Sequence, residues 1–392
     1  MPCGASPRLR WAGAKFGFSS NASRARERAA REVEATSLAK LDLPLLMRDA
    51  ETRHIKVNFD PALVRLLREV KYFLSLGIKV PKSARELYAQ YEVFRQWNGN
   101  LDLMVNVNNT VLQMLLPVEK PLLQMYLDKF DRAVESGMTK LNWKMDPSSI
   151  QEFIDAAMEQ VQLVDSITGT MKENIRHMDE VMEKWAAPVM DRKPKPIDNE
   201  EFDRIQKAAR QVHYSVIKEG GKEIHSRLKD TNKELRVSNA SKEWRNYVDF
   251  CNSIVIDGLA QCITTSLEYL LDQLNPVTES HLVEEQLPML EIVLDLNLQK
   301  REAKFVPPIG STENKKGLRD CVNNWIGGMF NVANMFKRLD GEGNYMRDMH
   351  SDCNVSALMA VVSVSISDTE QKLADLKAQF EEHQELWTTD LE

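Results

Sequence analysis

The chain has 392 residues, enough for two or three globular domains or for one elongated helical rod. Its 51 Lys and Arg against 58 Asp and Glu give a formal net charge of −7, which argues against nucleic acid as the main partner. Apolar residues make up 43% of the chain, enough for a buried core, and charged residues make up 28%, enough to cover long helices.

The cysteines are scattered along the chain and form no CxxC pair. This spacing is typical of reduced thiols in a cytosolic-type compartment. No run of about 18 apolar residues occurs, so no membrane-spanning segment is predicted. The five cysteines are Cys3, Cys251, Cys262, Cys321 and Cys353.

Residues 1–40 differ in composition from the rest of the chain. Arginines stand there among Ser, Ala and Gly with few acidic residues, at positions Arg8, Arg10, Arg24, Arg26, Arg28 and Arg31. We predict a disordered basic segment. A transit peptide and a wrongly assigned first exon are the alternatives.

The first predicted helix begins at Asp60 and Pro61, an N-cap carboxylate followed by a proline at the first helical position. Gly77 is a plausible end for this helix, and Pro81 prevents its continuation. The spacing predicts a buried face and no catalytic group. The apolar positions are Leu63, Leu66, Leu67, Val70, Phe73 and Leu74.

Three further helices are predicted before residue 140. They cover residues 83–97, residues 101–116 up to Pro117, and residues 120–135, with Gly137 as the end of the last.

The strongest pattern of the chain follows Asp146-Pro147. Apolar residues recur at alternating steps of four and three over five heptads, which predicts a left-handed helix–helix seam. We favour a long helix inside an antiparallel bundle over a free coiled-coil dimer. The seam comprises Ile150, Ile154, Ala157, Val161, Val164, Thr168, Met171, Ile175, Met178, Met182 and Trp185.

A stiff Lys/Pro linker at residues 193–198 is predicted to separate the first bundle from the second helical segment. A helix then begins near residue 199 and is interrupted at Gly220-Gly221, which we interpret as a bend or a hinge. Residues 241–274 form another dense helix, ended by Asn275-Pro276.

After this helix, apolar residues recur at every second position. Leucine and isoleucine alternate with polar residues over 290–298, which predicts a strand, and residues 304–306 are its candidate hairpin partner. Helices resume over 317–339 and 355–387. Because the last helix carries a core stripe close to Glu392, we expect a truncated product.

We thus predict a mainly α protein: an elongated series of helical bundles with long heptad-patterned helices and one small β-hairpin. The predicted domains are residues 1–40, a basic segment; 41–192, a first bundle; 193–198, a linker; 199–285, a second helical segment; 286–310, a β-hairpin insertion; and 311–392, a third helical segment.

Residues 310–317, GSTENKKG, are the nearest approach to a phosphate-binding loop. The motif requires Gly, Lys and then Ser or Thr where this chain has Lys315, Lys316 and Gly317. The second glycine and the magnesium-binding hydroxyl are therefore missing, and we predict a solvated turn. Residues 341–343, Gly-Glu-Gly, have no third glycine and follow no predicted strand, so we predict a loop.

Other candidate sites are equally weak. His350 and Cys353 are three residues apart, but zinc requires about four ligands and no second pair lies nearby. We place His213 and His225 at solvated positions beside Gly220-Gly221, and His383 at a partly buried helical position.

Nucleophilic catalysis has no local signature either, because GxSxG is absent and Ser363, Ser365 and Ser367 alternate with apolar residues that suggest packing. We therefore predict no catalytic, cofactor-binding or metal-binding residue in this chain, and no small-molecule substrate. An enzyme is the least favoured class.

Several strings in succession resemble one family. Residues 57–81, VNFDPALVRLLREVKYFLSLGIKVP, closely resemble the tail of axonemal dynein heavy chains, in N-terminal region 1. Residues 101–123 resemble the tail pattern of a helix, a short LL-x-x-E-x-P-L turn and a new helix. Leu141-Asn142-Trp143 resembles its L-x-W corner.

The resemblance continues to the end of the chain. Residues 304–308 resemble the F-x-P-P strand end of the tail, and Trp325-Ile326 and Leu386-Trp387 with Asp390 also fit. The similarity therefore covers about residues 41–392, and we place residues 1–40 outside it.

The resemblance implies a scaffold of consecutive helical bundles in an axonemal, outer-arm dynein. In the family this region binds intermediate chains, packs against neighbouring heavy chains and helps to anchor the motor to the doublet microtubule of the cilium. It implies a cytoplasmic and cytoskeletal location at the axoneme. The linker, AAA+ ring and stalk of the minus-end-directed motor lie further along in the family, and none of their residues can be assigned here.

The alternative is a freestanding helical adaptor of spectrin-like or coiled-coil type. Spectrin-like repeats would show self-similarity at a fixed period. Here the loops differ in length and the β segment occurs once. No nucleic-acid or membrane partner is predicted by either interpretation.

Overall fold

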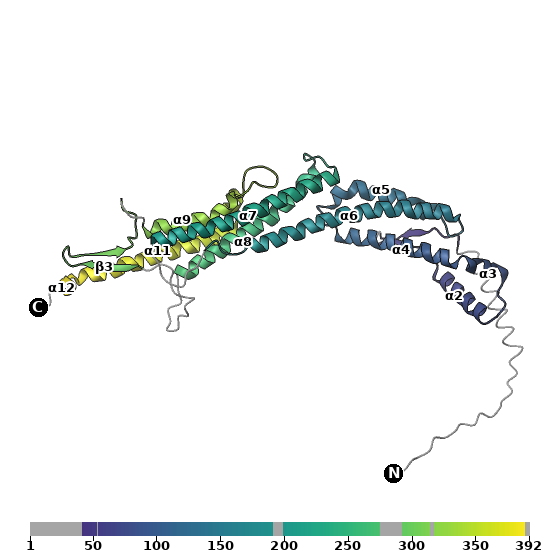
Figure 1. Ribbon diagram of the computed structural model, residues 1–392, viewed down its shortest axis with the longest axis horizontal. Coiled ribbons are helices and arrows are strands. Elements are labelled where there is room, and N and C mark those ends of the chain that lie inside the picture. Colours follow the sequence, from purple (N-terminus) through teal and green to yellow (C-terminus); the bar gives the residue numbers. More distant parts are fainter. Residues whose placement is uncertain (1–40, 53, 191–198, 275–291, 314–316, 389–392) are drawn as a thin grey trace, which may run out of the picture. The chain divides into compact units, whose positions relative to one another are not determined.

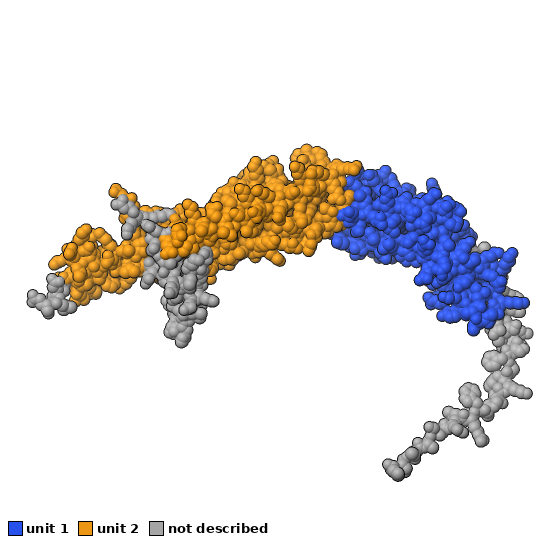
Figure 2. All heavy atoms as spheres, in the orientation of Figure 1, with its two compact units in different colours: residues 1–115, 123–166 blue, residues 116–122, 167–392 orange. Residues whose placement is uncertain are grey.

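The computed structural model describes residues 41–52, 54–190, 199–274, 292–313 and 317–388. Figure 1 shows its helices and strands along the chain. Its contacts divide the chain into two compact units, which Figure 2 shows in different colours. Unit 1 comprises the described residues of 1–115 and 123–166, and unit 2 those of 116–122 and 167–392. The predicted mainly α fold is confirmed. The predicted basic segment at 1–40 and the linker at 193–198 lie outside the described residues, and the predicted domain boundaries stay predictions.

Unit 1 begins with a short antiparallel hairpin that the sequence did not predict. Strands β1 (Leu46–Arg48) and β2 (Ile55–Val57) pair with Leu46 opposite Val57. The side chain of Asn109 accepts the amide of Ile55 at 3.2 Å and donates to its carbonyl at 2.9 Å. This two-way bond fixes β2 to a helix about 50 residues further along.

Helix α2 (Pro61–Ser75) begins and ends as predicted. The Asp60 carboxylate accepts the amide of Ala62 at 2.7 Å, and Pro61 occupies the first turn. Gly77 follows the helix with a φ of +66°, a backbone conformation that favours glycine. The buried face of the helix consists of Leu63, Leu66, Leu67 and Val70.

The predicted helices at 83–97 and 101–116 are wrong in their boundaries. The chain forms α3 (Lys82–Ala89) and then α4 (Tyr91–Met114), which continues through Gly99. A single glycine costs a helix only about 1 kcal/mol. The apolar stripe that crosses it is buried and outweighs that cost: Phe94, Trp97, Leu101 and Met104.

Helix α5 (Lys120–Thr139) runs past Gly137, so the predicted end at this glycine is wrong. A Cβ atom at Gly137 would lie 2.3 Å from the Phe153 ring. The glycine therefore allows close packing of α5 on α6. Trp143 lies in the same core, where its indole N–H donates to the Asn58 carbonyl at 3.1 Å and its ring is 4.6 Å from that of Phe59.

Helix α6 (Pro147–Trp185) matches the predicted heptad helix. Every predicted seam position except the half-buried Ile175 is buried within the chain, Thr168 included. The seam is therefore covered by helices of the same chain, which confirms the bundle and leaves no free coiled-coil surface along it.

Unit 2 is built on two long helices, α7 (Asn199–Leu235) and α8 (Lys242–Leu274). Helix α8 packs against α9 (Leu318–Phe330), α10 (Met346–Ser351) and α11 (Cys353–Glu382). The 3-10 turn η2 (Asn331–Asn334) follows α9, and α12 (Gln384–Thr388) follows α11.

The predicted interruption at Gly220-Gly221 is wrong, because α7 is continuous through both glycines. A Cβ atom at Gly220 would lie 2.6 Å from Val181, and one at Gly221 would lie 2.5 Å from the Phe336 ring. Both glycines are buried. They therefore provide room for side chains packed against α7, and the pair is neither a bend nor a hinge in this structure.

The predicted hairpin after α8 is confirmed. Strands β3 (Val293–Asn297) and β4 (Glu302–Val306) pair antiparallel with Leu294 opposite Phe305. Strand β4 packs against α11, and Ala303 is buried.

Helix α8 is long and apolar enough, by length and composition alone, to cross a membrane over Lys242–Asp272. Half of its most apolar window is buried inside the protein. Since α8 packs against three other helices of unit 2, we attribute its apolar character to core packing.

Candidate functional site

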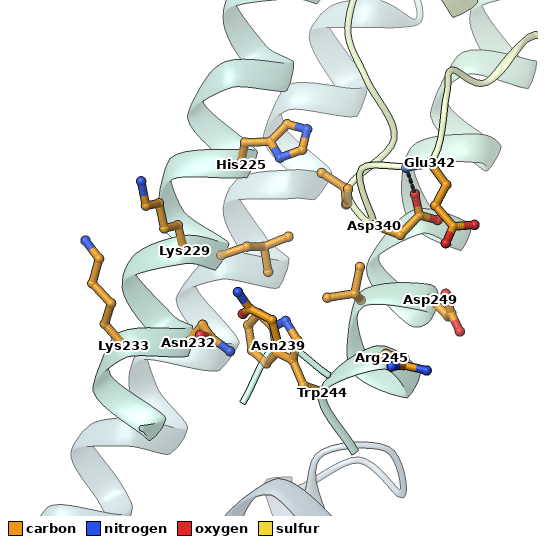
Figure 3. Close-up of a pocket in the computed structure, with 13 residues that line it drawn as sticks. His225, Lys229, Asn232, Lys233, Asn239, Trp244, Arg245, Asp249, Asp340 and Glu342 are labelled. Carbon is orange, nitrogen blue, oxygen red and sulfur yellow. Dashed lines mark hydrogen bonds between the residues drawn. The ribbon is translucent and has the colours of Figure 1, made fainter. Parts of the chain in front are cut away.

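A cleft of about 660 Å³ lies in unit 2 (Figure 3). Helices α7 and α8 and the loop between η2 and α10 form its walls. We call it the unit 2 cleft. Its lining consists of His225, Leu228, Lys229, Asn232, Lys233, Asn239, Trp244, Arg245, Val248, Asp249, Leu339, Asp340 and Glu342.

The unit 2 cleft has one basic wall and one wall that is mainly acidic. Helix α7 contributes His225, Lys229 and Lys233 at steps of four residues, so they lie along one side of that helix. The opposite wall carries Asp249 from α8, and Asp340 and Glu342 from the loop, together with one cation, Arg245 of α8 (Figure 3). The buried Trp244 and Val248 supply apolar surface.

The loop of the cleft is fixed by a network centred on Asp340. Its carboxylate accepts the guanidinium of Arg338 at 3.0 Å, the side-chain amide of Asn252 at 3.1 Å and the backbone amide of Glu342 at 2.8 Å. Arg338 also pairs with Asp348 and lies over the Tyr345 ring at 5.2 Å. The loop that carries Asp340 and Glu342 is therefore held in place before any partner binds.

Tyr345 and Asn252 hold the same loop through side-chain hydrogen bonds. The Tyr345 hydroxyl donates to the Asn252 side chain at 2.8 Å and accepts the Leu339 amide at 3.2 Å. Burial raises the pKa of Tyr345 well above its usual range, so its hydroxyl stays protonated and available as a donor. On the α7 side, the His225 ring contacts the Lys337 carbonyl at 3.0 Å.

A second polar group in unit 2 surrounds the buried Glu119. Its Oε2 atom lies 2.5 Å from Lys172 Nζ and accepts the Leu116 amide at 2.7 Å. This backward bond over three residues is a capping arrangement, and it fixes the turn that leads into α5. Glu119 is the acidic residue of the LL-x-x-E-x-P-L turn. The motif therefore marks this residue in the sequence, but the motif alone does not predict its contact with Lys172.

The buried groups near this turn are held in their neutral forms. Burial, with smaller contributions from Cys251 and Glu119, raises the pKa of Tyr247 well above its usual range. Burial also raises the pKa of the Cys251 thiol to about 12. We therefore assign these two groups to core packing rather than to chemistry, because a nucleophilic thiol requires a depressed pKa.

The residues considered from the sequence as possible sites have structural partners. Residues 314–316 of the 310–317 segment lie outside the described residues. The Ser311 hydroxyl accepts the Gly317 amide at 2.8 Å and donates to the Asp320 carboxylate. The His350 ring stacks on Phe330 at 5.2 Å. Among the described residues, no group of three or more His, Cys, Asp or Glu could hold a metal ion.

The remaining candidates also lie in helices. Ser363 and Ser367 donate to carbonyls four residues earlier in α11, at 2.9 and 3.1 Å. Burial lowers the pKa of His213, which is half-buried rather than solvated as predicted. His383 is exposed, and it lies at the end of α11 rather than at a partly buried position.

The described residues thus define a protein of long, packed α-helices with charged clefts. Residues 27–153 match the family described as dynein heavy chain, N-terminal region 1, so the match begins before Leu41. The chain belongs to the dynein heavy chain family, and it corresponds to the N-terminal tail of the axonemal type.

Several axonemal dynein heavy chains are similar over most of this chain. The dynein beta chain of the flagellar outer arm of Chlamydomonas reinhardtii is 36% identical over 92% of this chain and 9% of its own length. The ciliary dynein beta chain of Tripneustes gratilla is 29% identical over 91% of this chain and 8% of its own. Dynein axonemal heavy chain 17 of Mus musculus is 28% identical over 90% of this chain and 8% of its own length. This chain therefore spans under a tenth of these relatives.

Proposed function

We propose that this chain is the tail portion of an outer-arm dynein heavy chain and acts there as an assembly scaffold. It binds dynein intermediate chains and neighbouring heavy chains, and through them connects the motor to the doublet microtubule. The observation that carries this proposal is the similarity to a flagellar outer-arm beta chain over 92% of the chain. Such a protein works in the cytoskeleton of the cilium, at the axoneme.

Motor activity belongs to the remainder of the full-length protein in this account. A dynein heavy chain of full length is a minus-end-directed microtubule ATPase, and its AAA+ ring lies beyond the tail. This chain needs no cofactor and no small-molecule substrate for the scaffold role. The contribution of this chain is to bind partner subunits, which does not require ATP hydrolysis.

The structure offers two kinds of support for protein partners. Long helices present extended exposed faces, and one side of the unit 2 cleft contains Asp340, which Arg338 and Asn252 hold in place. Preorganised charged groups favour specific association, because little ordering entropy is lost on binding. A cleft with one basic wall and one mainly acidic wall suits a polypeptide segment that carries both signs.

The test uses purified components. The 392-residue chain is immobilised and exposed to recombinant intermediate chains of an outer-arm dynein and, separately, to the tail of a neighbouring heavy chain. We expect stable retention of an intermediate chain, with a neighbouring tail as the second partner. A folded chain that retains neither, while a longer tail retains both, would overturn the scaffold role for this segment.

A matched pair of variants locates the contact. Asp249→Lys with Glu342→Lys reverses two charges of the unit 2 cleft, whereas Asp155→Lys with Glu159→Lys reverses two acids on unit 1. We expect only the first pair to weaken retention. Equal loss from both pairs would show a nonspecific charge effect.

A further inference from the structure

The exposed face of α2 in unit 1 combines cations with large apolar side chains. Arg65, Arg68 and Lys71 alternate there with Val64, Tyr72 and Leu76, opposite the buried face of the helix. Val64 is 39% exposed, Tyr72 61% and Leu76, directly after the helix, 71%. We call these six residues the α2 face.

The cations of the α2 face have no ion-pair partner among the described residues. Other exposed arginines of unit 1 do form ion pairs, such as Arg48 with Asp131 at 2.7 Å. Residues 61–90 contain six Lys and Arg and only two Glu, in a chain whose net charge is −7. The α2 face is therefore a local excess of positive charge.

Apolar exposure at the same place is not explained by the fold. Val64 also lines a groove of about 410 Å³ together with Val57, Phe59 and Pro61, and Arg65 and Arg68 complete that side of it. The other wall is α4, where Asn98 donates to the Asp102 carboxylate at 2.8 Å. The groove therefore has apolar and basic residues on the α2 side and the Asp102 carboxylate on the α4 side.

We propose that the α2 face is a docking site for an acidic amphipathic segment of a partner protein. The carboxylates of the segment pair with Arg65, Arg68 and Lys71, and its apolar residues cover Val64, Tyr72 and Leu76. Arginine favours this role because its guanidinium binds carboxylates in a bidentate manner. Apolar area covered at the same face adds affinity that salt does not screen.

The charge of residues 1–40 argues against this segment as the ligand of the α2 face. Residues 1–40 contain eight Lys and Arg against three Glu, so this preceding segment has the same sign as the α2 face. This segment therefore does not supply the complementary charge, which the proposal assigns to a segment of a partner protein. The proposal does not rest on the assignment of intermediate chains as partners, because it concerns a surface of unit 1 and any acidic segment of this pattern.

The experiment measures binding of a fluorescein-labelled 20-residue peptide to the full chain by fluorescence anisotropy. The peptide is an amphipathic helix of glutamate and leucine, and a peptide with lysine in place of glutamate is its control. We expect saturable binding of the acidic peptide, weakened but not abolished at 0.5 M salt, and no binding of the control peptide.

Three variants separate charge from apolar contact. The triple variant Arg65→Glu, Arg68→Glu, Lys71→Glu should weaken binding at least roughly tenfold. The double variant Tyr72→Ser, Leu76→Ser should weaken binding several-fold, and the binding that remains should be lost at 0.5 M salt. Lys184→Glu, Lys218→Glu, Lys222→Glu reverses three exposed cations elsewhere and should leave binding unchanged. Surface changes of this kind alter stability little, and circular dichroism checks the fold.

Three outcomes would overturn the proposal. Unchanged affinity of the α2 triple variant shows that the peptide binds elsewhere. Equal affinity for anionic phosphatidylserine vesicles or a single-stranded oligonucleotide shows a nonspecific polyanion surface. A dimer in analytical ultracentrifugation that the α2 triple variant abolishes shows that a second copy of this chain occupies the face. None of these outcomes bears on retention of intermediate chains.

Discussion

Glu119 Oε2 lies 2.5 Å from Lys172 Nζ, and the Glu119 side chain has no exposed surface. The same oxygen accepts the Leu116 amide, so one carboxylate connects the turn before α5 to α6. Because a buried carboxylate is costly without compensation, the lysine is expected to be more important to stability than a surface ion pair.

Lys172→Met tests this relationship. Removal of the ammonium leaves the carboxylate buried with only a backbone donor, and we expect a loss of about 2–3 kcal/mol in the free energy of unfolding. Urea unfolding followed by circular dichroism measures it. Lys82→Met removes an exposed pair with Glu86 at 3.8 Å and should cost under about 0.5 kcal/mol. Equal effects would contradict the assignment.

Gly221→Ala tests the close packing on α7. Its Cβ would lie 2.5 Å from the Phe336 ring, and we expect a loss of about 1–3 kcal/mol because the ring must shift. Gly99→Ala is the matched control, since nothing lies within 4 Å of a Cβ at that helical position. This change should stabilise the protein by about 0.5–1 kcal/mol. Thermal unfolding of both variants gives the comparison, and a stabilising Gly221→Ala would refute the packing role.

Thiol labelling tests burial in unit 2. Cys353 is exposed, whereas Cys251 and Cys262 are buried and burial raises the pKa of each thiol to about 12. In a Cys3→Ser background, Ellman's reagent at pH 8 should modify Cys353 rapidly and the buried thiols only after unfolding. Cys353→Ser should remove the rapid phase. Rapid labelling of Cys262 in the native protein would contradict the structure.

The pH dependence of stability follows from the same burial. The pKa of Cys262 is raised to about 12 in the folded protein, so the unfolded chain loses this proton first as pH rises. Stability from the neutral thiol is therefore complete below the ordinary thiol pKa of about 8.5 and is lost between there and about 12.

Cys262→Ala makes that loss measurable. Between pH 8 and pH 10.5 the wild type should lose on the order of 2 kcal/mol more than the variant in urea unfolding. Cys353→Ala, at an exposed thiol, should follow the wild type. A Cys262→Ala variant that loses as much stability as the wild type would show that another group controls this range.

Local patterns were enough to predict most helices. Asp60-Pro61 and Gly77 bounded α2, and the heptads from Ile150 to Trp185 gave the full length of α6. Period-two alternation located the β3–β4 hairpin. These signals are local because caps and amphipathic faces are encoded within a few residues of each other.

Glycines were the main source of error. Gly137 suggests a helix end and Gly220-Gly221 a bend or a hinge, but Gly137 and Gly221 each lie within a helix where another side chain occupies the space of a Cβ. Sequence alone cannot distinguish these roles, because the partners Phe153 and Phe336 are distant along the chain. Strands β1 and β2 were missed since three residues each are too short for a periodic signal.

The unit 2 cleft was not predictable for a similar reason. Its network joins Asn252 of α8 to Asp340 and Tyr345 of a loop about 90 residues later, with no local motif. The Glu119 contact was closer to prediction, because its turn belongs to the strings that resemble dynein tails. Family resemblance therefore identified the region more reliably than it identified contacts.

The most direct test of the central claim follows the chain in ciliated cells. An epitope-tagged 392-residue chain is expressed, cilia are isolated, and the salt extract of the axonemes is separated on a sucrose gradient. We predict that the tagged chain enters the axoneme and cosediments with outer-arm intermediate chains. A folded chain that remains in the cell body, or that sediments apart from every dynein subunit, would contradict the scaffold account.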